Sequence, residues 1–188
     1  LTHDDAPKSA DVRLDKLAWI AAIWIFVITA SLSYFVYQAH PHVPDEAQYI
    51  FQANYMAAGQ LTVAPPRVPE ALELYMVPIQ EARWFSIFPP VWPALLAIGT
   101  LLGASWLVNP ILSGLCILLA YLLFQHLYSM PFARASVLLL SCSPWFIFMG
   151  MSYMSHIAAL FFSLTAALLL MHGVKKKSGL LALMAGLA

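Results

Sequence analysis

The chain has 188 residues, of which 62% are hydrophobic and only 10% are charged, and its formal net charge is zero. This composition excludes an ordinary water-soluble domain, and the neutral charge balance gives no reason to expect nucleic acid as a partner. The two cysteines, Cys116 and Cys142, lie within apolar segments and offer neither a disulfide framework nor a metal-ligand spacing. The composition predicts an all-α integral membrane protein, a polytopic helix bundle.

The long apolar segments predict the membrane spans. Residues 1–16 form a charged N-terminal segment, and the uncharged stretch 17–39 is long enough to cross a bilayer. The uncharged tract 135–174 would measure about 60 Å as one helix, about twice a hydrocarbon core, so we expect two spans with a turn near 150–156. The later predicted spans are 107–126, 133–150 and 154–172, with 178–188 as the start of a further span. Because the chain opens at Leu1 and stops in an apolar run, we expect it to be a piece of a longer protein.

The basic residues predict the orientation. They gather in the N-terminal segment, at Arg134 and at 175–177. The positive-inside rule places all three groups on the cytoplasmic side, which requires an even number of crossings between the first group and the last. The four predicted spans satisfy this parity only if segment 86–104 does not cross. Three prolines in its first half leave a short helix, which indicates a re-entrant segment, with a short kinked span as the alternative.

Residues 40–90 form a long outer loop, and long loops in compact proteins are usually functional. The loop carries five of the nine acidic residues. Its first part predicts an amphipathic helix over 45–58 at the membrane surface, because apolar side chains recur there at helical spacing. These positions are Ala47, Ile50, Phe51, Tyr55 and Ala58. Gly59 is placed to stop the helix.

Asp45 has two interpretations that do not exclude each other. It stands where the N-cap of the 45–58 helix is expected, and Gln48 three residues later completes a pair like a capping box. A carboxylate at a helix N-terminus beside a membrane cavity is also suited to taking a proton from a hydroxyl group. The sequence predicts both a cap and a candidate general base at Asp45.

The order of these elements resembles the GT-C superfamily of polytopic glycosyltransferases, in particular the family 39-type branch of protein mannosyltransferases and lipid A aminoarabinose transferases. The resemblance consists of a first span, Asp45-Glu46 followed by Tyr49, a helix ending in Gly59, a proline-rich stretch with Phe88-Pro89-Pro90, and several spans. It covers most of the chain from Leu17 onward.

The resemblance implies transfer of a sugar, with inversion, from a polyprenyl-phosphate donor to a lipid, glycan or protein acceptor at the outer face of the membrane. Asp45 would be the catalytic base. Glu46 would be a second acid that orients the acceptor or holds a divalent cation, and Tyr49 would contact substrate. The expected location is a bacterial inner membrane, with the active site facing the periplasm or the outside.

Three further residues are candidates for binding the lipid phosphate or the sugar. Arg83 and then Arg67 are the first choices for the phosphate, because a guanidinium group matches phosphate geometry. Relatives often carry a lysine just before the proline element, and this chain has none there. Each arginine is otherwise an exposed loop charge or a headgroup contact. His156, near the predicted 150–156 turn, is either a phosphate or sugar ligand or a helix-end histidine bonded to a carbonyl.

His40 and His42 offer a weak alternative metal site together with the following carboxylates, and interfacial histidines explain the pair better. Two functions other than sugar transfer also fit the composition. The chain could belong to a lipid or solute transporter or flippase, or it could be a non-catalytic assembly subunit in which Asp45-Glu46 only caps a helix.

Overall fold

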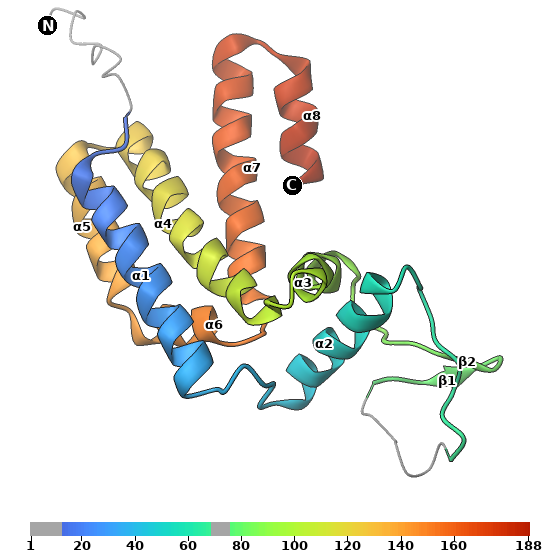
Figure 1. The fold of residues 1–188 in the computed structure, drawn as a ribbon. Coiled ribbons are helices and arrows are strands. Elements are labelled where there is room, and N and C mark those ends of the chain that lie inside the picture. Colours follow the sequence, from blue (N-terminus) through green and yellow to red (C-terminus); the bar gives the residue numbers. More distant parts are fainter. Residues whose placement is uncertain (1–12, 69–75) are drawn as a thin grey trace, which may run out of the picture.

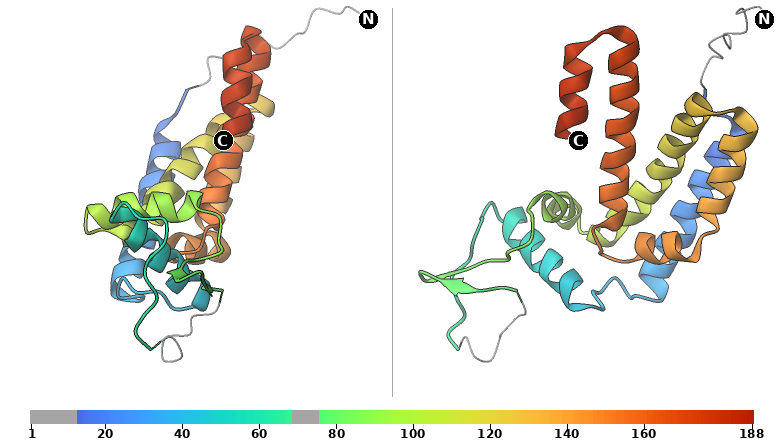
Figure 2. Two further views of the ribbon diagram at one scale, coloured as in Figure 1. Left: turned by 90° about the vertical axis from the view of Figure 1, so that its right-hand side faces the viewer. Right: turned by 180° about the vertical axis from the view of Figure 1, so that it is seen from behind.

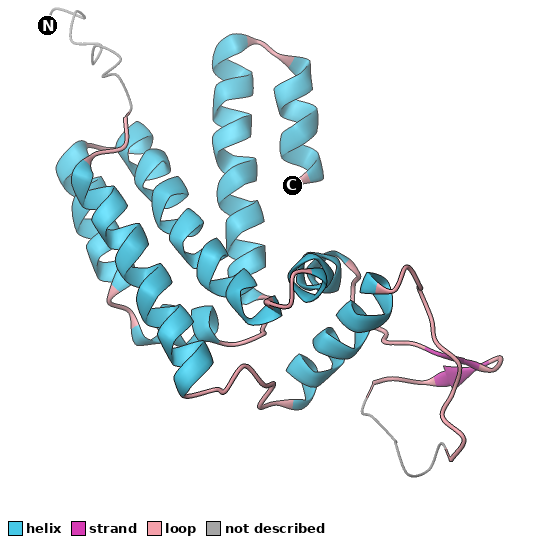
Figure 3. Ribbon diagram, viewed as in Figure 1, coloured by secondary structure: helices cyan, strands magenta, loops and turns pink. Residues whose placement is uncertain are grey.

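The computed structural model describes residues 13–68 and 76–188 (Figure 1). Most of the predicted segment 1–16, and residues 69–75 of the predicted outer loop, lie outside this range. The helices are α1 (Lys16–Phe35), α2 (Pro44–Ala57), α3 (Val91–Leu101), the 3-10 turn η2 (Ser105–Leu107), α4 (Val108–Leu127), α5 (Met130–Ser141), α6 (Pro144–Met151), α7 (His156–Lys176) and α8 (Gly179–Leu187). A small hairpin joins β1 (Ile79–Gln80) to β2 (Arg83–Trp84) in antiparallel register. The predicted all-α class is confirmed (Figure 3).

Within the described ranges, three helices are long and apolar enough to cross a membrane. They are α1, the continuous segment formed by η2 and α4, and α7. Their bounds lie within a few residues of the predicted segments 17–39, 107–126 and 154–172. The predicted span 17–39 extends too far at its C-terminal end. Helix α1 stops at Phe35, and the chain then turns through Gln38 and Ala39, whose backbones are in the left-handed region.

The predicted span 133–150 is wrong as one continuous helix. It consists of α5 and α6, whose axes differ by 60° at a break of a few residues. Pro144 is the physical reason, since its ring has no N–H to donate and excludes the carbonyl of the preceding turn. If the bent pair counts as one crossing segment, the described residues contain up to four.

The three predicted basic groups lie at one end of the bundle. The start of α1, the connection from α4 to α5 and the connection from α7 to α8 are at the same end in two opposite views (Figures 1 and 2). The ion pair between Arg134 Nε and Asp15 Oδ2, 2.7 Å long, links two of these places directly. Lys175 and Lys176 occupy the last turn of α7.

At the opposite end, α2 and α3 lie across the bundle rather than along it (Figure 2). With 11 residues, α3 is about 16 Å long, which is too short for a bilayer core of about 30 Å. In Figure 2, α3 does not run parallel to the long helices, and the non-crossing of segment 86–104 stays a prediction. Helix α3 approaches the start of α4 closely at Gly99, where an added Cβ would lie 2.6 Å from Val108 Cγ2.

Small residues bring α1 and α4 close together. Ala18, Ala21 and Ala22 on α1 are buried, and a Cβ added to Gly114 of α4 would lie 3.2 Å from the carbonyl oxygen of Ala22. Helices in membranes associate through such small side chains, because burial against a partner gains little over lipid tails. Residues of both helices along this seam belong to the buried core.

Candidate functional site

The first turn of α2 begins one residue earlier than predicted. Pro44 is the first helical residue and Val43 is the N-cap, which makes no side-chain capping bond. A proline is favoured at this first position because its fixed φ suits a helix and its missing N–H would have no partner there. The prediction that Asp45 is the N-cap is therefore wrong, and so is the capping-box role of Gln48, which is buried. Asp45 and Glu46 both lie in the first turn, at the positive end of the helix dipole.

Glu46 connects α2 to the distant turn between α6 and α7. Its side chain is 1% exposed. One carboxylate oxygen accepts a hydrogen bond from the backbone N–H of His42 at 2.7 Å, and the other accepts from the N–H of Tyr153 at 3.1 Å. The Tyr153 hydroxyl donates in turn to the carbonyl of Ala39 at 2.9 Å. Both oxygens of Glu46 thus hold backbone in place, while its predicted contact with acceptor or cation stays a prediction.

Two more side chains fix the carbonyl groups of the same turn. The indole N–H of Trp92, from α3, donates to the carbonyl of Tyr153 at 2.8 Å. The amide of Asn109, from α4, donates to the carbonyls of Ser152 at 2.7 Å and Met154 at 2.8 Å. Residues 152–154 therefore receive bonds from α2, α3 and α4, and we call this meeting point the junction.

The surroundings of two phenol groups near Glu46 favour their neutral forms. Burial raises the pKa of Tyr153 above the ordinary value for a phenol, and the Glu46 carboxylate raises it further. The pKa of Tyr37 is raised for the same two reasons. Neither phenol is therefore suited to act as the base that removes a proton from a substrate near neutral pH.

A cavity of about 200 Å³ lies beside the junction, between α2, α3 and the first turn of α7. Its lining residues are Tyr49, Pro89, Val91, Trp92, Ser155, Ala158, Ala159 and Phe162. The walls are mostly apolar, and the polar groups include the hydroxyls of Tyr49 and Ser155, whose oxygen atoms are 3.4 Å apart. The structure thus brings the outer loop and the predicted 150–156 turn together.

Asp45 lies one helical turn before Tyr49, and residues four apart share a face of a helix. Asp45 therefore shares a helix face with one residue of the cavity wall, although it does not line the cavity itself. The Asp45 side chain is partly exposed. Within 13–68 and 76–188 it makes no hydrogen bond or ion pair, so its carboxylate is not committed to holding the fold.

His156 is the first residue of α7 and is exposed. Its ring lies edge-on to Trp145 of α6, with the ring centres 6.4 Å apart. Ser155, its neighbour in the chain, lines the cavity. The structure therefore places His156 at the same end of the bundle as Asp45, beside the cavity rim.

The two predicted phosphate-binding arginines are not brought to Asp45. Arg83 is exposed on β2, and its neighbour Trp84 packs against Phe51 in the second half of α2. The hairpin lies beyond the C-terminal end of α2, whereas Asp45 is in the first turn (Figure 1). A helix of 14 residues is about 21 Å long. Arg67 is exposed next to residues that the structure does not describe.

The histidine pair does not form a metal site in the described part of the chain. No group of three or more His, Cys, Asp or Glu side chains there is arranged to hold a metal ion. The His42 ring packs against Tyr37, with ring centres 4.1 Å apart, and its backbone N–H is bonded to Glu46. His40 is exposed.

The sequence reasoning missed Asn109 and Trp92, which hold the junction. A signal for Asn109 was present, because a primary amide inside an apolar segment needs a partner and commonly marks a functional place. Trp92 carried no comparable signal among the other aromatic residues. The chain matches no protein-family model, no curated protein and no solved structure.

Proposed function

We propose that the chain is an integral membrane protein in which α2, α3 and the junction lie at the membrane surface opposite the basic residues. Two observations support this placement. Helix α1 exposes large apolar side chains, including Trp19, Ile20 and Ile23, which water would not favour. The basic residues at the other end follow the positive-inside rule. We infer a bacterial inner membrane, with the junction facing the periplasm or the outside.

We propose further that the protein transfers a sugar from a polyprenyl-phosphate donor to an acceptor hydroxyl, and that Asp45 is the general base. The observation that carries this proposal is the position of Asp45. Its carboxylate is partly exposed, caps no helix, and lies one helical turn from a small cavity at the membrane surface. The neighbouring Glu46 has both oxygens bound, which leaves Asp45 as the acid of the pair that can accept a proton.

In the proposed reaction, the acceptor oxygen attacks the anomeric carbon and a new C–O bond forms there. The bond from that carbon to the donor phosphate breaks, and the polyprenyl phosphate leaves with the bonding electrons. The proton of the acceptor hydroxyl goes to Asp45. Attack on the side opposite the phosphate inverts the anomeric configuration.

The leaving phosphate needs positive potential, and we place it at the first turn of α7. Backbone N–H groups at a helix start favour anions, and this turn contributes Ser155 to the cavity wall. His156 stands beside it, and an N–H of its ring can donate a hydrogen bond. Arg83 and Arg67 reach the phosphate only if the outer loop moves toward α7 when the donor binds.

The test is sugar transfer in membranes that contain the full-length protein and labelled polyprenyl-phosphate sugars. We expect Asp45→Asn to lower the transfer rate by roughly 100-fold to 10,000-fold, the range for losing a positioned general base. The matched control is Glu81→Gln, an identical loss of charge in the exposed hairpin turn, which should keep the wild-type rate. Both variants must be compared at equal amounts of folded protein.

Two results would argue against this function. Undiminished transfer by Asp45→Asn would remove Asp45 as the base while leaving the transferase intact. An absence of transfer from every donor offered to the wild-type protein would instead favour a transporter, a flippase or an assembly subunit.

A further inference from the structure

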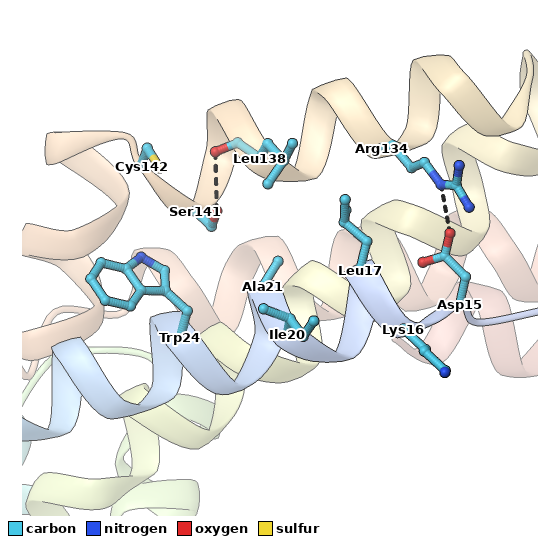
Figure 4. A pocket seen from close by; sticks show the side chains of 10 residues that line it. All are labelled: Asp15, Lys16, Leu17, Ile20, Ala21, Trp24, Arg134, Leu138, Ser141 and Cys142. Carbon is cyan, nitrogen blue, oxygen red and sulfur yellow. Dashed lines mark hydrogen bonds and ion pairs between the residues drawn. The ribbon is translucent and has the colours of Figure 1, made fainter.

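A second cavity lies far from the junction, between α1 and α5. It has a volume of about 670 Å³, within the range of roughly 300–1,000 Å³ typical of ligand pockets. Its lining residues are Asp15, Lys16, Leu17, Ile20, Ala21, Trp24, Arg134, Leu138, Ser141 and Cys142. Figure 4 shows Asp15, Lys16 and Arg134 at one end and Trp24 and Cys142 at the other. We call this cavity the α1–α5 groove.

The length of the α1–α5 groove matches one leaflet of a bilayer. Lys16 and Trp24 are eight positions apart on α1, and Arg134 on α5 is eight positions before Cys142, the C-cap of that helix. Each pair therefore spans about 12 Å along its helix. Half of a hydrocarbon core is about 15 Å. A groove that starts at the basic end of the bundle reaches most of the way to the midplane.

The charges are confined to the end where a lipid headgroup would lie. Asp15 accepts a hydrogen bond from the N–H of Ala18 with one oxygen and pairs with Arg134 Nε through the other. The Arg134 side chain is still 45% exposed, and its terminal nitrogens do not take part in that pair. Together with Lys16, the three side chains carry a formal charge of +1, from two cations and one anion. This end is complementary to a phosphate group.

We propose that the α1–α5 groove binds one anionic phospholipid from the leaflet on the basic side, with an acyl chain along Ile20 and Leu138 and the phosphate at Lys16 and Arg134. The inference rests on the proposed membrane placement but not on the transferase reaction. The site is separate from the proposed donor site, which lies at the opposite end of the bundle. The bound lipid would cover the apolar surface between α1 and α5 that neither helix buries.

The test counts the lipids that remain bound to the purified protein. Native mass spectrometry is carried out in detergent with dioleoyl phosphatidylglycerol or dioleoyl phosphatidylcholine at equal concentrations. We expect the wild-type protein to retain the anionic lipid in preference. Lys16→Gln removes one positive charge and should lower that preference about fivefold, because one Lys or Arg near an anionic surface contributes about 1 kcal/mol.

Three further variants locate the binding. Asp15→Asn keeps an N-cap acceptor and raises the formal charge of the rim from +1 to +2, so the preference for the anionic lipid should increase. Leu138→Trp fills the apolar part of the groove and should reduce retention of both lipids. Lys176→Gln changes a cation at the same end of the bundle but outside the groove, and should change neither.

The proposal is overturned if the wild-type protein retains the two lipids equally, or if Leu138→Trp retains as much of both as the wild type. It is also overturned if Lys16→Gln and Lys176→Gln lower the preference by the same factor. That result would mean that the basic end attracts anionic lipid in general and that the groove binds none in particular.

Discussion

Replacing Glu46 by Gln tests whether one buried carboxylate holds the outer loop against the bundle. Glutamine has nearly the same size, but only one of its two terminal atoms can accept a hydrogen bond. It can keep the bond from the N–H of His42 or the bond from the N–H of Tyr153, and its own amide group then faces the other donor. The variant therefore loses at least one bond to a charged acceptor in a site that is 1% exposed.

The expected cost follows from that geometry. A hydrogen bond to a charged group contributes about 1.5–3 kcal/mol, and burial leaves little solvent to replace it. If the turn at Tyr153 opens locally, its opening free energy falls by about that amount. Amide hydrogen exchange at Tyr153 should then be faster by roughly tenfold to a hundredfold.

The assay is hydrogen exchange of the purified protein in detergent, read by mass spectrometry on peptides that contain Tyr153 and His42. Glu81→Gln is the control, since Glu81 is exposed in the hairpin turn. The reasoning would be refuted if exchange around Tyr153 were unchanged in Glu46→Gln, or if Glu81→Gln accelerated it to the same extent. Acceleration of exchange throughout α4 would indicate global unfolding and would also contradict a local clamp.

Two further perturbations test the bundle itself. Gly150→Ala would place a Cβ 2.6 Å from Ser113 Oγ, and we expect the free energy of unfolding to fall by roughly 1–3 kcal/mol. The assay is unfolding in detergent followed by tryptophan fluorescence. The control is Gly186→Ala, whose added Cβ meets no atom within 4 Å and should leave the free energy of unfolding unchanged. Burial raises the pKa of Asp15, but its bonds to Ala18 N–H and Arg134 outweigh this and leave the pKa below 3.8. A carboxyl group whose pKa is lowered by folding stabilises the folded protein above its unfolded-state pKa. The contribution of Asp15 to stability should therefore be present above about pH 3.8 and be lost as the pH falls through its folded-state pKa. A stability difference between wild type and Asp15→Asn that does not narrow over that pH range would contradict this.

The long helices could be predicted because their signals are local. Apolar length alone located α1, α4 and α7, and Gly59, which adopts a positive φ of 74°, was recognisable as a helix stop. The start of α2 was misread, although its signal was also local. The preference of proline for the first helical position prevailed over the preference of aspartate for the N-cap.

The path of the outer loop could not be predicted, since it depends on contacts between residues far apart in the sequence. The clamp from Glu46 to Tyr153 joins residues separated by 107 positions. The location of Arg83 follows from the packing of Trp84 against Phe51, which no periodic pattern encodes. Residue type therefore indicates that an arginine of the loop suits a phosphate, but it does not indicate whether that arginine lies near Asp45.

The orientation of α2 gives the strongest connection between the fold and the proposed chemistry. The sequence predicts an amphipathic helix at the membrane surface. In the structure, Ile50 and Phe51 are only partly buried, whereas the polar side chains of Glu46 and Gln52 are buried. Burying polar side chains costs about 1–3 kcal/mol for each group left without a partner, and the Oε1 atom of Gln52 has none within the described residues. The buried side of α2 combines these polar side chains with Tyr49, Ala53 and Tyr55, and Tyr49 also lines the small cavity. In the proposed reaction, this mixed surface would hold the acceptor near Asp45 at the start of the helix.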